Sequence, residues 1–377
     1  MRVNYLNAPA RCNGLGLITP MPRCFNSYQN DIRDRLISIR GWFHRIDPGT
    51  HRRIKGLRLV TAFGLAALLA TVPQISRGHA ISLSPLAAGF ALWASVSEGK
   101  TTRYECARDL AFLCIAAGLG AASLVILTPL LGASWSELTL ISGSFCAGFL
   151  RRFGVLGSGI GSQILIGQLL AYNAGAQNVD VATIMLAVLV ATLASVVPRT
   201  LSGPSEQPAT GAPSSAEDDA GAFSEVFMGL QSATAALSII VLGHFVGLTE
   251  SAWAIAACTY VVASSPSGTI DRVRRRIIGT MVGVPLAIAC LPLAVHAPLA
   301  IWLAAATAMV VYAVALPDHY DIASGAYAFA LIVTMAASGE YPVATLLARL
   351  WETVVGGALG VAVLLLLTPV WRWSHAT

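Results

Sequence analysis

Twelve apolar segments follow one another between residues 57 and 370, and short polar stretches separate them. Most approach the length of about 20 residues that crosses the hydrocarbon core of a bilayer as a helix. The fourth and the eighth are shorter, which is typical of tilted or broken spans. The sequence therefore predicts an all-α polytopic membrane protein with about 12 transmembrane helices. The segments are 57–76, 81–97, 109–131, 136–150, 155–172, 180–198, 224–247, 250–265, 277–295, 298–316, 322–338 and 346–370.

The polar stretches divide the chain. Residues 1–56 lack the apolar core of a secretory signal. Within them, apolar residues recur at helical spacing over 31–46 between arginines, which predicts an amphipathic helix on the cytoplasmic membrane surface. Residues 200–222 are rich in Pro, Gly and Ser and contain no Lys, Arg or aromatic residue, so they are predicted to be a disordered linker. This linker separates a first half, 57–199, from a second half, 223–371, which a short tail, 372–377, follows.

The two halves share a sequence pattern. The motif ASxxxGxxxR after the second apolar segment, at 94–103, recurs 169 residues later at 263–272. Each half contains six segments, so both copies enter the membrane in the same direction. The pattern therefore predicts a parallel six-helix repeat.

Charge sets the orientation. With the N-terminus inside, 22 of the 24 Lys and Arg residues fall on the inner side, and Arg77 and Arg349 remain for the outer side. Because cytoplasmic loops carry an excess of Lys and Arg, both termini are predicted to be cytoplasmic. The composition, 55% hydrophobic and 11% charged with a mean hydropathy of +0.68, excludes an ordinary soluble enzyme. The cations flank apolar segments, so the net charge of +5 does not indicate nucleic-acid binding.

Motifs of soluble enzymes are missing from the sequence. It contains no P-loop, no GxSxG and no HExxH, and its seven cysteines show neither a CxxC pair nor a metal-ligand spacing. We therefore predict that the protein is not an enzyme and uses no cofactor or metal.

Ionisable residues within the apolar segments are the best candidates for function, because each is costly in a membrane. Arg349 and Glu352 open the last segment at i,i+3 spacing and share a helix face. They form either an ion pair at the outer interface or an anion contact, with Glu352 as counter-charge or titrating group. Asp180 occupies the position of Arg349 in the repeat and is predicted to face it between the halves.

Other candidates are weaker. His244 is a candidate proton carrier, although a lone histidine is more often a packing residue. Trp93 and Trp253 are either interfacial residues or stacking surfaces for an aromatic ligand. The basic run 271–276, at the end of an inner loop, is either a topology signal or a cytoplasmic anion vestibule built from Arg272, Arg275 and Arg276.

The run from Arg272 to Gly283, RVRRRIIGTMVG, resembles the R…RxxGTxxG signature of the fusaric-acid-resistance-like (FUSC) family, which includes the aromatic acid exporters. Residues 349–356, RLWETVVG, are similar to the RxxxTxxG entry to that family's last span, and Pro369 matches its closing proline. The resemblance implies an inner-membrane exporter of aromatic carboxylic acids that uses the proton gradient. It implies a small organic anion and membrane lipids as partners, with a periplasmic adaptor protein in some members and a homo-oligomer as a further option.

Larger exporters of this family carry a sizeable cytoplasmic domain after each membrane half, and this chain has only the linker and a short tail in their place. Two alternatives therefore stand beside the exporter: a passive organic-anion channel, and a membrane protein of the same fold that does not transport.

Overall fold

In the computed structural model, residues 51–77, 83–99, 102–175, 179–202, 221–246, 251–262, 266–316, 318–337 and 343–374 are described. The predicted amphipathic helix 31–46 lies outside these residues, as does most of the predicted linker 200–222. The predicted boundaries of these segments therefore stay predictions.

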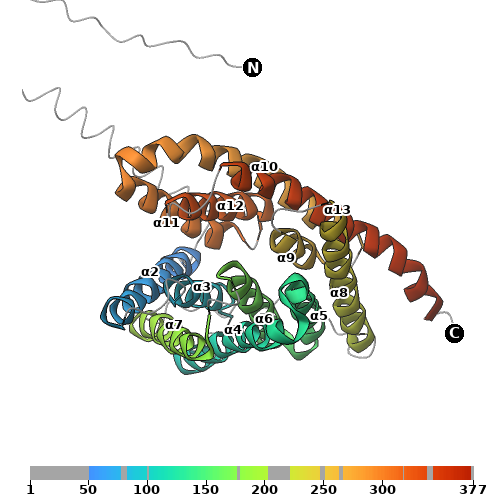
Figure 1. The fold of residues 1–377 in the computed structure, drawn as a ribbon, viewed down its shortest axis with the longest axis horizontal. Helices are drawn as coiled ribbons and strands as arrows, with labels where there is room; N and C mark the ends of the chain where they lie inside the picture. The colour runs from blue at the N-terminus through green and yellow to red at the C-terminus, as the bar shows by residue number, and fades with distance from the viewer. Residues whose placement is uncertain are drawn as a thin grey trace, which may run out of the picture. The chain divides into compact units, whose positions relative to one another are not determined.

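The described part of the first half consists of helices joined by short connections (Figure 1). Each helix lies on one of the predicted apolar segments, and α5 is only 11 residues long, as the short fourth segment indicated. Two 3₁₀ turns, η1 and η2, flank α5. The elements are α2 (His51–Arg77), α3 (Leu83–Val96), α4 (Arg103–Leu131), η1 (Ala133–Leu138), α5 (Thr139–Phe149), η2 (Leu150–Phe153), α6 (Gly154–Asn173) and α7 (Val181–Leu201).

The second half has a matching series of helices on the remaining segments. Here α9 is 11 residues long, in line with the short eighth segment. The main difference from the prediction is α10, which begins at Pro266, so the basic run 271–276 lies in a helix and not in a loop. The helices are α8 (Gly221–Val246), α9 (Ser251–Val261), α10 (Pro266–His296), α11 (Pro298–Ala315), α12 (Tyr320–Ala337) and α13 (Val343–Ser374).

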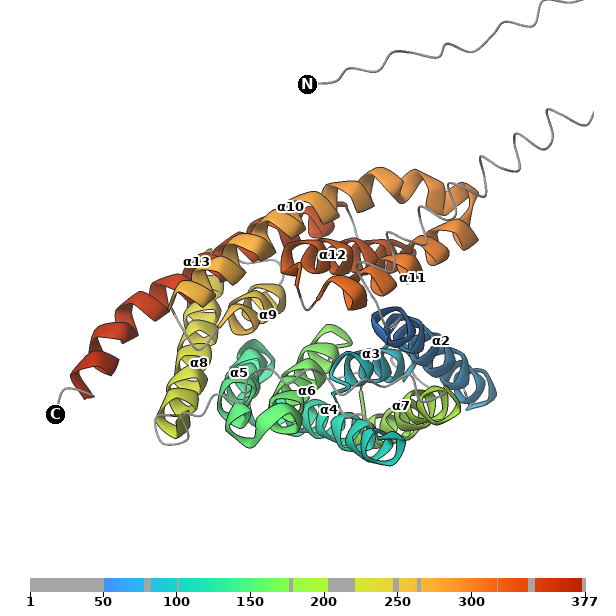
Figure 2. The ribbon, with the colours of Figure 1, turned by 180° about the vertical axis from the view of Figure 1, so that it is seen from behind.

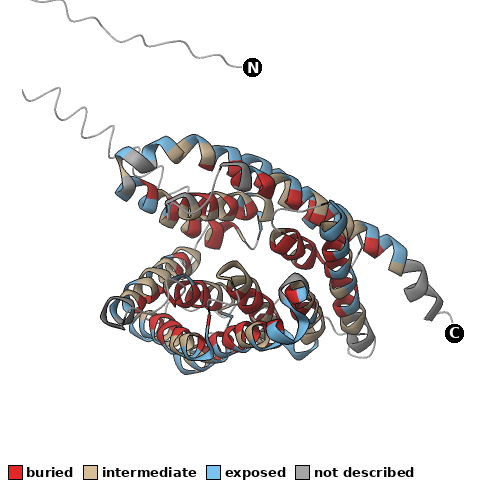
Figure 3. Cartoon of the chain, in the orientation of Figure 1, coloured by how far each residue is buried: buried red, intermediate tan, exposed pale blue. Residues whose placement is uncertain are grey.

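Seven segments of the described chain are long and apolar enough to cross a membrane, and four further apolar helices are shorter. Their outward faces carry large apolar side chains, such as Leu119 on α4 at 64% exposure and Met185 on α7 at 69%. Figure 3 shows the buried positions on the faces that meet neighbouring helices. Apolar outer faces of this kind are suited to lipid, and the protein is a multi-pass membrane protein.

The helices pair in the same way within each half. In the first half α4 packs on α6 and α7, α5 on α6, and α7 on α2 and α3; in the second half α10 packs on α12 and α13, α11 on α12, and α13 on α8 and α9 (Figures 1 and 2). Helices α2 to α7 correspond in order to α8 to α13, and each pair in the first half then has its counterpart in the second half. This common pairing supports the predicted repeat, which stays a prediction.

Two of the seams at which the halves meet are counterparts of each other. At the α5–α8 seam Gly148 lies against Gly229, and a Cβ atom on Gly148 would come within 2.6 Å of the Gly229 nitrogen. At the α2–α11 seam Gly56 faces Val310, and Arg52 Nη1 lies 2.6 Å from Asp318 Oδ2 just beyond α11. Both seams therefore depend on glycine for close helix approach.

Candidate functional site

Arg349 lies buried on α13 against aromatic rings from two other helices. Arg349 is 5% exposed, and its guanidinium carbon lies 4.0 Å from the ring centroid of Trp253 on α9. The ring centroid of Tyr327 on α12 is 5.6 Å away. A guanidinium at these distances is attracted to the ring faces. The cation is therefore held inside the helix bundle and does not reach out to the membrane surface.

The Arg349 guanidinium keeps unused donors. Its Nε and Nη1 atoms are buried and have no hydrogen-bond partner. Each buried donor without a partner costs about 1–3 kcal/mol of stability. The ring faces attract the charge of the guanidinium, but they leave its Nε and Nη1 N–H groups without hydrogen bonds. These donors match an anion that approaches in the plane of the guanidinium, above all a carboxylate.

More aromatic side chains extend from Tyr327. The ring centroids of Tyr327 and Trp93 are 5.2 Å apart, and Tyr312 lies 6.0 Å from Tyr327 and 6.4 Å from Trp93. Trp93 comes from α3 of the first half, whereas both tyrosines belong to the second half. We call Trp93, Trp253, Tyr312, Tyr327 and Arg349 the Arg349 cluster. Both halves contribute to it.

A carboxylate and a second cation lie close to the cluster. Glu352, less than one helical turn from Arg349, is completely buried and interacts with it electrostatically. Arg276 on α10 donates from Nη1 to the Tyr320 hydroxyl at 3.2 Å and interacts electrostatically with Arg349. Gly279, where a Cβ would meet the Ser324 side chain, lets α10 approach α12 closely enough for this bond. The site thus combines two cations, one carboxylate and several aromatic rings.

The structure does not bring Asp180 to Arg349, contrary to the expected meeting between the halves. Asp180 is exposed, and its carboxylate accepts a hydrogen bond of 2.8 Å from the Thr183 backbone nitrogen at the start of α7. That bond caps the helix. Moreover, α7 packs on α2, α3 and α4, while α13 packs on α8, α9 and α10. Asp180 is a capping residue in this structure.

Of the remaining predicted site residues, some lie near Arg349 and others do not. Arg276 points inward, but Arg272 is exposed and donates to the Val262 carbonyl oxygen, and Arg275 pairs with Asp271 at 2.8 Å. His244 is exposed and stacks on Trp135 with ring centroids 5.5 Å apart. Of the predicted vestibule, only Arg276 therefore lies close to the Arg349 cluster.

A groove of about 590 Å³ lies elsewhere, between α10, α11 and α12. Its walls are almost wholly apolar, with Val282, Leu286, Val311 and Phe329 among them, and Asp321 is its single charged side chain. The groove lacks a cation and opens beside outward apolar side chains. Its chemistry suits hydrocarbon, so the Arg349 cluster is the better candidate for an anion.

Sequence reasoning missed Tyr312 and Tyr327. A signal for Tyr327 was present, because Tyr320 and Tyr327 are seven residues apart and so share a face of α12. Tyr312 gave no such signal, since its contact with Trp93 depends on how the two halves pack.

Residues 237–363 match the fusaric acid resistance protein-like family model. This match confirms the resemblance that the sequence motifs indicated, and it covers about a third of the chain, in the second half. It includes Trp253, Arg276, Tyr327, Arg349 and Glu352, whereas Trp93 lies outside it. No curated protein and no solved structure matches the chain. The family is one of membrane transport and resistance, which fits the multi-pass helical fold.

Proposed function

We propose that the protein is a secondary transporter that exports small aromatic carboxylic acids across the inner membrane, driven by the proton gradient. In this proposal all twelve helices cross or enter the membrane as two six-helix repeats, and both termini are cytoplasmic. The observation that carries the proposal is the buried Arg349 guanidinium with free Nε and Nη1 atoms between aromatic rings.

The substrate class follows from the two kinds of contact in the cluster. A carboxylate would accept hydrogen bonds from Arg349 and neutralise a cation that is otherwise buried. Trp93 already contacts Tyr312 and Tyr327 edge to face, and an aromatic ring of the substrate would extend this arrangement. An aliphatic acid would gain the charge contact and lose the ring contacts, so aromatic acids should be preferred.

Glu352 is the proposed proton-coupling group. It is completely buried beside Arg349, so its charge state depends on whether the substrate carboxylate is present. An ionised Glu352 and a substrate carboxylate compete for the one Arg349 cation, so the occupancy of Arg349 by the anion and the protonation of Glu352 depend on each other. For export driven by an inward proton gradient, the proposal requires that the proton enters on Glu352 in the return step, after the anion has left.

We expect Glu352→Gln to uncouple these events. Glutamine keeps the size of the side chain but cannot titrate, so exchange of labelled substrate across proteoliposomes should continue while accumulation driven by a pH gradient falls at least about tenfold. Thr353→Ser, on the neighbouring position of α13, is a matched control. Equal accumulation by wild type and Glu352→Gln would remove this role from Glu352.

The proposed function is tested by comparing three solutes that differ in one property each. Proteoliposomes containing the full chain should transport benzoate, transport cyclohexanecarboxylate more slowly because the ring is not aromatic, and exclude benzamide because it lacks charge. Transport of benzoate that does not respond to a pH gradient would indicate the passive channel. Failure to transport any of the acids would indicate a membrane protein of this fold with another role.

A further inference from the structure

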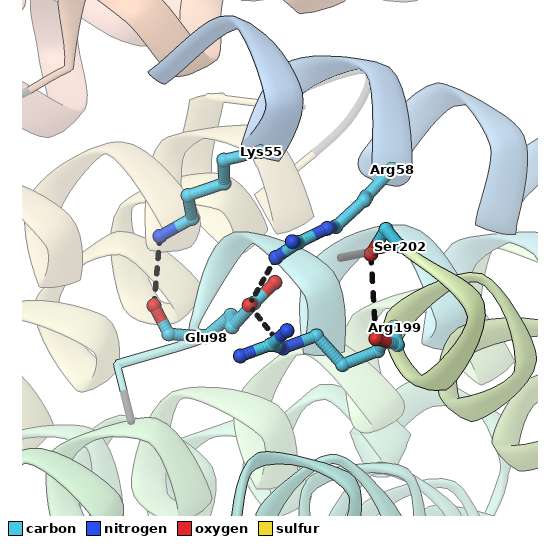
Figure 4. A network of polar contacts seen from close by, with 5 residues as sticks. All are labelled: Lys55, Arg58, Glu98, Arg199 and Ser202. Carbon is cyan, nitrogen blue, oxygen red and sulfur yellow. Dashed lines mark hydrogen bonds and ion pairs between the residues drawn. The ribbon is translucent and has the colours of Figure 1, made fainter. Parts of the chain in front are cut away.

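A second polar cluster lies in the first half, where three cations converge on one acidic residue (Figure 4). Arg58 Nη1 on α2 lies 2.9 Å from Glu98 Oε1, and Arg199 Nε at the end of α7 lies 2.8 Å from the same oxygen. Lys55 Nζ, one turn before Arg58, donates to the Glu98 backbone oxygen at 2.8 Å. We call Lys55, Arg58, Glu98 and Arg199 the Glu98 cluster.

Like charges lie close together in this cluster. Three cations face one carboxylate, and the Arg58, Glu98 and Arg199 side chains are 11%, 9% and 1% exposed. The nearby carboxylate of Asp109 pairs with Arg108 at 3.1 Å, so it brings its own cation. Water screens such buried charges weakly, and like charges close together repel. An added anion would relieve this repulsion.

Arg58 presents a defined place for that anion. Its Nη1 atom binds Glu98, while its Nε and Nη2 atoms are buried and have no hydrogen-bond partner. These two atoms form one edge of the planar guanidinium, and their N–H bonds run parallel. Such an edge matches two oxygen atoms of one phosphate or carboxylate group.

The surroundings favour phosphate over a carboxylate. Phosphate offers more than two acceptor oxygens, so it can meet the Arg58 edge and approach a second cation, such as Lys55, at the same time. The cluster lies where the sequence predicts the cytoplasmic membrane surface, and Leu57, beside Arg58, is 63% exposed. Basic pockets between membrane helices on this side bind phosphate-containing head groups.

We propose that the Glu98 cluster binds a phosphate group through the Nε–Nη2 edge of Arg58, with Lys55 and Arg199 as the supporting cations. This site is separate from the Arg349 cluster and does not depend on the proposed transport. The phosphate group belongs either to an anionic lipid or to a soluble phosphate, and the two sources share the same recognition.

The test uses the full chain, purified and stripped of lipid, in two arms. In the first arm inorganic phosphate is titrated against sodium chloride of equal ionic strength, and the melting temperature is followed. In the second arm phosphatidylglycerol or phosphatidylcholine is added, and bound lipid is counted by native mass spectrometry. Saturation by inorganic phosphate assigns a soluble ligand, whereas selective retention of phosphatidylglycerol assigns a lipid head group.

Variants connect the binding to the proposed edge. In whichever arm the wild type binds, Arg58→Gln should weaken the affinity for inorganic phosphate or phosphatidylglycerol at least about tenfold. The reason is that it removes a charged two-point contact. Arg58→Lys should keep the fold and the charge but still weaken binding, since lysine lacks the fork. Arg274→Gln, which removes an exposed cation from α10, should bind as wild type does.

Two outcomes would overturn the proposal. One is a wild-type protein that responds in neither arm beyond its sodium chloride or phosphatidylcholine control. The other is equal binding by wild type and Arg58→Lys, which remains informative even if Arg58→Gln does not fold. Either result would leave the Glu98 cluster as an internal ion-pair network.

Discussion

Arg349→Lys is expected to reach the membrane at normal levels and to lose most export. Lysine carries the same charge and tolerates a similar position, but it lacks the planar guanidinium that stacks on Trp253 and directs Nε and Nη1 to different sides. Loss of a charged hydrogen bond to the substrate corresponds to about 1.5–3 kcal/mol, hence at least about tenfold in transport efficiency. Initial rates of benzoate transport in proteoliposomes, normalised to folded protein, measure this effect.

Two further variants make that result specific. Arg349→Ala should abolish transport, because it removes both the charge and the stacking surface. Arg108→Lys, an equivalent exchange at an exposed arginine outside the Arg349 cluster, should transport as wild type does. Full export by Arg349→Lys would reduce Arg349 to a packing residue and remove the main contact of the proposed substrate site.

Glu98→Gln is expected to have the largest effect on stability. Glu98 Oε1 is the shared partner of Arg58 and Arg199, so glutamine removes the carboxylate from two buried ion pairs. Breaking a buried ion pair by removing one partner costs about 3–5 kcal/mol. The folded yield and the melting temperature of the purified protein should therefore both fall sharply.

The matched control is Glu105→Gln on α4. Glu105 accepts a hydrogen bond of 2.9 Å from the exposed Thr102 hydroxyl, which a glutamine oxygen also accepts. Its melting temperature should stay close to that of wild type. If Glu98→Gln is as stable as Glu105→Gln, the Glu98 cluster does not hold the ends of α2, α3 and α7 together.

The positions of the helices could be predicted from the sequence, because membrane spans need long apolar runs and these runs are visible without tertiary information. The short α5 and α9 were predicted for the same reason. The start of α10 was not, since a run of arginines is typical of a loop beside a span. In the structure Asp271 and Arg275 pair at i,i+4 spacing and continue the helix through this run.

The functional sites were predictable only in part. Arg349, Glu352 and Trp253 drew attention because charged and aromatic side chains at the ends of spans are costly or specialised. Their aromatic neighbours come from other helices, so periodicity along one helix could not identify them together. The Glu98 cluster was missed because Arg58 and Arg199 served as orientation signals, and no local pattern joins them to Glu98.

The two seams between the halves differ in what fills them. Gly148 and Gly229 bring two backbones together with no room for a side chain between them, whereas Arg52 and Asp318 close the α2–α11 seam with an ion pair of partly exposed side chains. Water readily replaces an exposed ion pair, but the backbone contact would leave a gap in lipid if it parted. If a transport cycle rocks one half against the other, the α5–α8 seam would therefore be the axis of rotation. The contacts of Trp93 with Tyr312 and Tyr327 would then part on the side of α2 and α11.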